Sequence, residues 1–280
     1  MNAKISIFAC LTCLAVFLAG CKDDDNEKPE GIQPPDIITQ AFNAKYPGIT
    51  QVEWNVADNY YVADFENDST SIDAWFSDNG TWMMEEAELR VTLIPDDIQN
   101  AIQQGAYASW MVEDASIINR AGMGTVYKVE VKKNSQEVDL YYTEFGNLIK
   151  TVEDTDANTD QPIPIPAEVK TLMELTFPGA TLLDIIPNSS GYLLALLDKN
   201  IYKTSQLNKE YRWQNTTWEI TEQQVPAIVM QGFESSAYAN DQVESIYVLI
   251  NADGTFYKFN LIQNNQPISV KFDVFGNIKN

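Results

Sequence analysis

A proline that can start a helix recurs four times in this chain, at Pro35, Pro95, Pro166 and Pro226. Each proline is followed by apolar residues three and seven positions later, and these two positions lie on the same face of a helix. Proline is well tolerated in the first turn of a helix, because its missing N–H group would have no partner there. The pattern therefore predicts four units that each open with an amphipathic helix.

The spacing of these prolines groups the four units into two similar halves. The intervals are 60, 71 and 60 residues, so the first and third units, and the second and fourth, are 131 residues apart. Other segments repeat at nearly the same distance, such as Phe145-Gly146-Asn147, which returns as Phe275-Gly276-Asn277. A double repeat kept in register over this length predicts two domains with one architecture.

After each helix the apolar residues alternate with polar ones, as expected for strands with one buried face. We expect the helices to cover the face that carries the apolar residues, and the opposite face to be open to water. The fold class is therefore α+β: tandem repeats of a helix plus an antiparallel hairpin, with the helices packed on one face of an antiparallel sheet in each of two similar domains. The apolar residues in the first domain are Tyr61, Phe65, Ala74, Phe76, Val129, Val138 and Leu140.

The N-terminal region has the features of a secretory signal. Residues 1–20 carry one charge and an apolar run that is shorter than a membrane-spanning helix needs. The run ends in Leu18-Ala19-Gly20-Cys21, which resembles a bacterial lipobox, and this resemblance implies that Cys21 is lipidated and becomes the mature N-terminus. Residues 21–35 then form a charged, proline-rich tether. An uncleaved signal anchor is the alternative.

These features imply an outer membrane lipoprotein, on the cell surface or on the periplasmic face, that is attached to the membrane through Cys21. Cleavage would remove Cys10 and Cys13, so no thiol is left for a disulfide bond. The chain has no histidine, which excludes catalytic and metal sites that need an imidazole. Its net charge of −22 argues against nucleic acid as a partner.

The segment between the two halves, residues 153–163, is acidic and rich in proline, as is typical of a linker. It places the domains at residues 36–152 and 164–280. The alternating acids of this segment begin like a calcium-binding loop. However, Thr159 stands where such a loop needs glycine, and Ile165 stands where it needs a bidentate glutamate. We expect a solvated linker, with a calcium loop as the minor alternative.

Several short motifs of the first half, with weaker counterparts in the second, resemble the PepSY-like periplasmic domains of Bacteroidota. Those domains are named for their likeness to beta-lactamase inhibitor proteins. The resemblance implies a binding or inhibitory role, and the family brings no catalytic residues to carry over to this chain. The motifs are Tyr46-Pro47-Gly48, Val52-Glu53-Trp54, Ala74-Trp75-Phe76, Asn79-Gly80-x-Trp82 and Leu93-Ile94-Pro95.

The distribution of acidic residues gives little support to catalysis. The acids fall on turns, helix starts and outward strand positions, where a charge is simply solvated. We therefore expect a non-catalytic binding or inhibitor-like module without a cofactor or a metal. A structural spacer without a specific ligand is the alternative, and an enzyme that acts on glycans through carboxylates is the remote one.

Strand alternation places three aromatic residues, Tyr60, Trp75 and Tyr141, on the face opposite the helices, next to Asp64 and Asp73. Aromatic anchors within a charged rim are typical of an interface, although packing across the strands is an equal alternative. Residues 36–150 hold 19 acidic and 7 basic residues. We therefore expect this face to bind a cationic or neutral partner, which could be a protein, a peptide or a glycan.

Overall fold

The computed structural model describes residues 32–154 and 160–279. Residues 1–20, Cys21 and most of the expected tether lie outside these ranges, so the signal and lipidation assignments stay predictions. Within the described ranges, no helix has the length and apolar character needed to cross a membrane.

The first domain is built from two units, each with one α-helix followed by four strands. A 3₁₀ helix, η1 (Val91–Leu93), joins the units. The elements of the first unit are α1 (Asp36–Lys45), β1 (Glu53–Ala57), β2 (Tyr60–Asn67), β3 (Thr70–Ser77) and β4 (Trp82–Glu88). Those of the second are α2 (Asp96–Gln104), β5 (Met111–Arg120), β6 (Val126–Lys133), β7 (Gln136–Tyr142) and β8 (Leu148–Glu153).

The second domain repeats this order, with η2 (Glu222–Gln224) between its two units. The first of these, the third unit of the chain, holds α3 (Ala167–Thr176), β9 (Thr181–Asn188), β10 (Gly191–Asp198), β11 (Ile201–Leu207) and β12 (Trp213–Ile220). The fourth unit of the chain holds α4 (Ala227–Glu234), β13 (Gln242–Asn251), β14 (Gly254–Gln263), β15 (Gln266–Asp273) and β16 (Ile278–Lys279).

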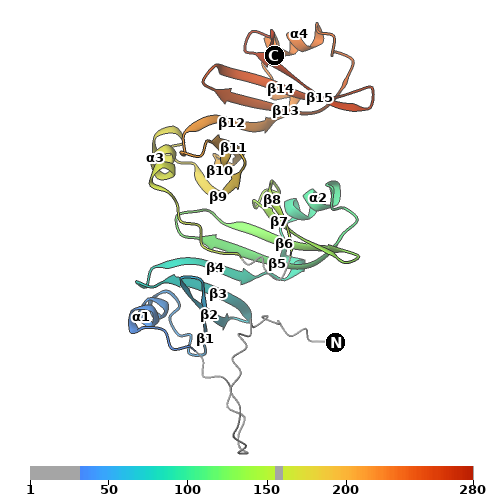
Figure 1. Ribbon diagram of the computed structural model, residues 1–280. Coiled ribbons are helices and arrows are strands. Elements are labelled where there is room, and N and C mark those ends of the chain that lie inside the picture. The colour runs from blue at the N-terminus through green and yellow to red at the C-terminus, as the bar shows by residue number, and fades with distance from the viewer. Residues whose placement is uncertain (1–31, 155–159, 280) are drawn as a thin grey trace, which may run out of the picture.

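Each domain forms one eight-stranded antiparallel sheet in which every strand pairs with its neighbours in sequence. The four units follow one another along a long molecule (Figure 1). The expected α+β fold with two similar domains is therefore confirmed. One detail differs: each unit carries four strands, whereas the sequence pattern indicated one hairpin after each helix.

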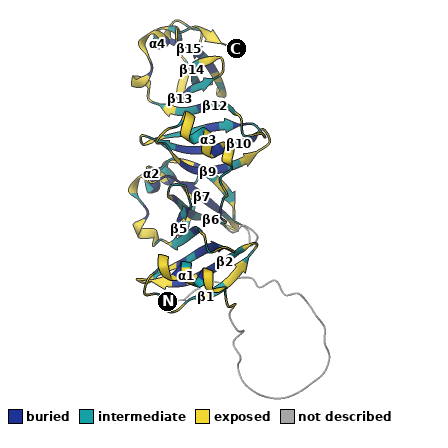
Figure 2. Cartoon of the chain, turned by 90° about the vertical axis from the view of Figure 1, so that its left-hand side faces the viewer, coloured by how far each residue is buried: buried dark blue, intermediate teal, exposed yellow. Residues whose placement is uncertain are grey.

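The helices cover one face of each sheet, as expected, and each begins at the residue after its proline. In the first unit, Ile38 and Phe42 of α1 pack on Phe65, Ala74 and Phe76. In the second unit, the buried residues of α2 pack on strands β5 to β7 in the same way. Figure 2 shows buried segments in the strands of every unit, with exposed residues on the helices and turns.

The opposite face of the first sheet is not open to water along its whole length, and this corrects the prediction for two aromatic residues. Trp75 and Tyr141 lie on that face, as the alternation predicts, but they are only 7% and 4% exposed. They belong to a cluster that includes Leu183 of β9 and Ala195 of β10. The second domain therefore covers one end of this face, and the aromatic residues there are part of a core.

The C-terminal half of the predicted linker also lies on this face. Asp160 receives hydrogen bonds from Arg120 at 2.8 Å and from the Tyr141 hydroxyl at 2.9 Å. The next residue, Gln161, donates to Asp58 at 2.7 Å in the β1–β2 turn. The described part of this segment is therefore a strap across the sheet. Residues 155–159, which include two acids or amides of the possible calcium loop, lie outside the described residues.

Direct contacts also join the two domains. The amide of Gly124 donates to the carbonyl of Leu182 at 2.8 Å, and Lys150 lies 2.9 Å from the buried carboxylate of Asp184. These two contacts fix the register of β9 against the first domain. The carbonyl of Leu182 and the carboxylate of Asp184 belong to buried residues, and buried polar groups need partners. The burial of Trp75 and Tyr141 follows from this contact.

Candidate functional site: an acidic groove on the first sheet

The part of this face that the second domain leaves uncovered holds an acidic groove of about 230 Å³. The groove crosses four strands, from β3 to β6, and so spans the junction between the two units. Its lining contains five carboxylates and one ammonium group. The lining residues are Ser71, Asp73, Glu86, Glu88, Asp114, Ala115, Ser116, Lys128 and Glu130.

Strand register brings these residues together from distant parts of the sequence. Asp73 of β3 is paired with Glu86 of β4, and Glu88 of β4 is paired with Ser116 of β5. Ser116 is paired in turn with Lys128 of β6. Directly paired residues share one face of a sheet, so a row of polar side chains forms across the strands. A row of carboxylates at this spacing creates a strongly negative local potential.

Lys128 is the one basic residue among the described residues of the lining, and neighbouring carboxylates hold it in place. Its ammonium group lies 3.2 Å from Asp160, 3.3 Å from Glu86 and 3.8 Å from Asp139. Burial lowers the pKa of Lys128, but these three carboxylates raise it by more, so the side chain stays charged. Its positive charge is therefore already matched, and the other acids of the groove form no ion pair with the described residues.

Asp73 is an acid of the groove lining whose environment disfavours its charge. Burial, followed by the nearby charges of Asp64 and Glu86, raises the pKa of Asp73 to about 7. Asp64 is paired with Asp73 across β2 and β3, and burial and neighbouring glutamates raise its pKa as well. Like charges held side by side without a cation are relieved when a cation arrives. A bound ammonium or guanidinium group would therefore be favoured here.

The raised pKa of Asp73 predicts that Asp73→Asn stabilises the protein above neutral pH. Between about pH 4 and 7, an unfolded chain gives up this proton while the folded chain keeps it, so stability falls as the pH rises. We expect the variant to gain on the order of 1–2 kcal/mol at pH 8, after allowance for solvent screening, and almost nothing at pH 4. Urea unfolding at both values measures this. An equal effect at both would contradict the assignment.

Asp139 lies at the border of the groove, beside Glu130 on the adjacent strand. It is only 3% exposed, and its Oδ1 atom has no hydrogen-bond partner among the described residues. Burial is the largest cause that raises its pKa to about 7, partly opposed by Lys128 and reinforced by further carboxylates. The groove therefore continues into a buried acid whose hydrogen-bonding capacity is incompletely used.

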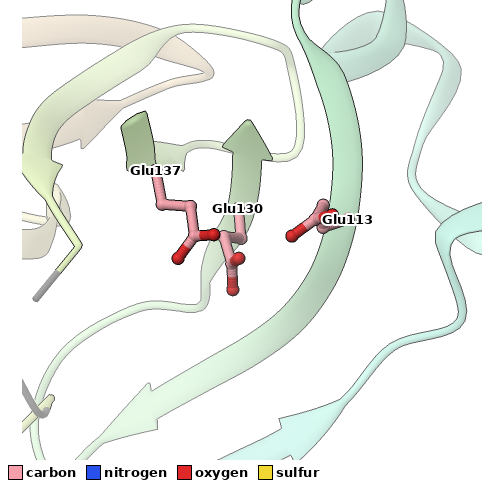
Figure 3. A group of neighbouring side chains, drawn as sticks. All are labelled: Glu113, Glu130 and Glu137. Carbon is pink, nitrogen blue, oxygen red and sulfur yellow. The ribbon is translucent and has the colours of Figure 1, made fainter. Parts of the chain in front are cut away.

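A second acidic cluster lies farther along the same face, at Glu113, Glu130 and Glu137 (Figure 3). Their carboxylate oxygens lie within 4.8 Å of one another, on β5, β6 and β7. Lys132 contacts Glu113 at 3.1 Å and also pairs with Glu137. Because this lysine already supplies the positive charge, the cluster fits an ion-pair network better than a metal centre.

The structure separates the five binding residues expected from the sequence. Asp73 lines the groove and Asp64 is its neighbour, whereas Trp75 and Tyr141 lie in the core. Tyr60 is half-buried at the edge of that core. Glu86 and Glu88 are groove residues that were not expected from the sequence, although Met84, Glu86 and Glu88 of β4 alternate along the chain as the residues of the other strands do.

Comparison with solved structures finds small proteins of Bacteroides. One is a BLIP-like protein from Bacteroides fragilis, with 30% identity, a TM-score of 0.44, and coverage of 48% of this chain and 96% of that chain. Another is a DUF2874 family protein from Bacteroides ovatus, with 27% identity, a TM-score of 0.42, and coverage of 44% and 89%.

A third is described as a periplasmic protein from Bacteroides eggerthii, with 19% identity, a TM-score of 0.42, and coverage of 43% and 89%. No curated protein matches the chain. The family described as beta-lactamase-inhibitor-like, PepSY-like matches residues 59–150 and 195–280, which together make up more than half of the sequence. These two matched regions fall one in each of the two domains, and the chain therefore belongs to the PepSY-like family.

Proposed function

We propose that this protein is a lipid-anchored, non-catalytic binding module of the bacterial cell envelope. In this proposal Cys21 carries the anchor, and the acidic groove of the first domain holds a lysine- or arginine-bearing segment of a protein partner. The beta-lactamase-inhibitor-like family supports a binding role of this kind. The sequence suggested Trp75 and Tyr141 as aromatic anchors for the partner, but both are buried. In this proposal the acidic groove is the binding surface in their place.

The observation that carries the proposal is the imbalance of charge in the groove. Five carboxylates line it, and the single lysine among them is already surrounded by three acids. The volume of about 230 Å³ suits one long side chain better than a whole small molecule, since small-molecule sites usually occupy about 300–1,000 Å³. A cationic side chain on a partner complements both the charge and the size.

Removing two charges from the groove should abolish capture of the partner. In Asp73→Asn/Glu88→Gln, no ion pair to a described residue is lost, so the fold should be unaffected while the groove loses two carboxylates. We expect the soluble body, residues 22–280, to capture a partner from native envelope extracts, and the variant to bind it at least about tenfold more weakly.

The matched control is Glu210→Gln/Asp253→Asn, which makes the same two kinds of substitution at exposed positions of the second domain. This control should bind like the wild type, and wild-type binding should weaken as salt is added, because charges steer the contact. Equal loss in both double variants would show that only net charge matters. Full binding by the groove variant would contradict the proposed site.

A further inference from the structure

The second sheet carries a groove at the position that matches the acidic groove by register. In the first domain Asp73 is paired with Glu86, and in the second domain Thr204 is paired with Thr217. Each member of the second pair lies 131 residues after its counterpart, which is the repeat distance of the domains. The two domains therefore place a groove on the same part of their sheets and line it with different chemistry.

The second groove is larger and is partly formed by the other domain. Its volume is about 540 Å³, which lies within the range of about 300–1,000 Å³ that is usual for small-molecule sites. The first domain contributes Gly146 and Asn147 of the turn between β7 and β8, and Leu148 at the start of β8, to its wall. Sites of this kind often lie where two domains meet. The groove therefore exists only in the assembled two-domain chain.

Its charge differs sharply from that of the acidic groove. Glu219 is the one charged residue among the described residues that line it, and the hydroxyl of Tyr247 donates to this carboxylate at 3.4 Å. No lysine or arginine in the described part of the lining could bind an anion. A single exposed carboxylate also gives little affinity for a polycation. The ligand that fits is therefore uncharged.

The lining is rich in neutral groups that donate and accept hydrogen bonds. The hydroxyls of Thr204 and Thr217 bond to each other at 2.8 Å, and each keeps further capacity for a ligand. The amides of Asn147 and Asn200 and the ring of Tyr202 complete the polar and aromatic surface. Rings give apolar contact to C–H groups, while hydroxyls and amides match the hydroxyls of the ligand.

We propose that this second groove binds a neutral, polyhydroxylated ligand, namely a segment of an uncharged oligosaccharide. The site is separate from the acidic groove and does not depend on what that groove binds. An apolar peptide would offer no hydrogen bonds to the asparagine amides or to the remaining capacity of the bonded threonine hydroxyls, which disfavours it. A sugar segment can pair with them and can also lie against the tyrosine rings.

Titration of the soluble body, residues 22–280, with neutral oligosaccharides tests this inference. We expect saturable binding of at least one of maltohexaose, cellohexaose, mannohexaose and chitohexaose by calorimetry. In the isosteric double variant Thr204→Val/Thr217→Val, both hydroxyls of the bonded pair are lost together, so neither is left unpaired in the fold. We expect this variant to melt like the wild type and to bind at least about tenfold more weakly.

Asp73→Asn is the matched control, since it changes the acidic groove alone, and its affinity for the sugar should equal that of the wild type. The inference is overturned if no neutral oligosaccharide binds more tightly than about 1 mM. It is also overturned if the double threonine variant binds as well as the wild type, or if an uncharged apolar peptide binds this groove and the sugars do not. None of these outcomes bears on the proposed role of the acidic groove, so each proposal can be contradicted without the other.

Discussion

Asp160→Ala should destabilise the protein more than any other single change in the segment between the domains. Asp160 accepts a hydrogen bond from the guanidinium of Arg120 at 2.8 Å, and both side chains are at most 5% exposed. Without the aspartate, the Nε of Arg120 could still donate to the carbonyl of Gln161 at 3.2 Å, but its buried positive charge would have no carboxylate partner among the described residues. Breaking one half of a buried ion pair typically costs about 3–5 kcal/mol, and we expect a loss in unfolding free energy of this size.

Gln161→Ala is the matched control for Asp160→Ala. The glutamine is the next residue in the chain and donates to Asp58, but it is exposed to water, so we expect a change below about 0.5 kcal/mol. Urea unfolding of the soluble body measures both variants. If Asp160→Ala lost no more stability than Gln161→Ala, the strap across the first sheet would not be a structural element of the protein.

Trp75→Ala should behave as a core truncation and reduce stability by about 3–5 kcal/mol. Trp75 is 7% exposed and packs in the cluster that includes Leu183 and Ala195 of the second domain. Loss of the indole would therefore leave a cavity where the domains meet. Thermal unfolding should show the loss, and binding of an apolar dye to the native protein should increase.

Tyr60→Ala provides the comparison on the same face, because Tyr60 is only half-buried at the edge of this cluster. A smaller loss, about 1–2 kcal/mol, is expected for it. If Trp75→Ala were as stable as the wild type, the indole would be on the surface. That result would instead support Trp75 as an exposed anchor for a partner.

The helices and the faces of the strands could be predicted from the sequence because both depend on short-range periodicity. Ile38 and Phe42 lie one helical turn apart, and Ala74 and Phe76 lie two residues apart on a strand. The spacing of each pair therefore identifies the buried face of its helix or strand. The repeat distance then predicted two similar domains. Consistent local patterns of this kind determine the fold class without any knowledge of long-range contacts.

Long-range contacts decided what the sequence could not show. The burial of Tyr141 depends on Asp160, 19 residues later, and on strands of the other domain. Asp160 lies in a segment whose composition is typical of a solvated linker, and its burial is explained by its contacts with Arg120, Lys128 and Tyr141. The acidic groove was equally hidden, since its carboxylates converge through the pairing of four strands. Alternation assigned the face of a residue but not what covers that face.

A site-specific photo-crosslinker in living cells tests the central claim most directly. Placed at Ser71 or Asp114, which are exposed residues of the acidic groove, it should join the protein to one partner. Mass spectrometry should locate the link beside a lysine or arginine of that partner. At Gln103, an exposed residue of α2 on the helical face, the same crosslinker should give no such product. Equal crosslinking at Gln103, or a linked segment without basic residues, would contradict the claim that the acidic groove is the binding site.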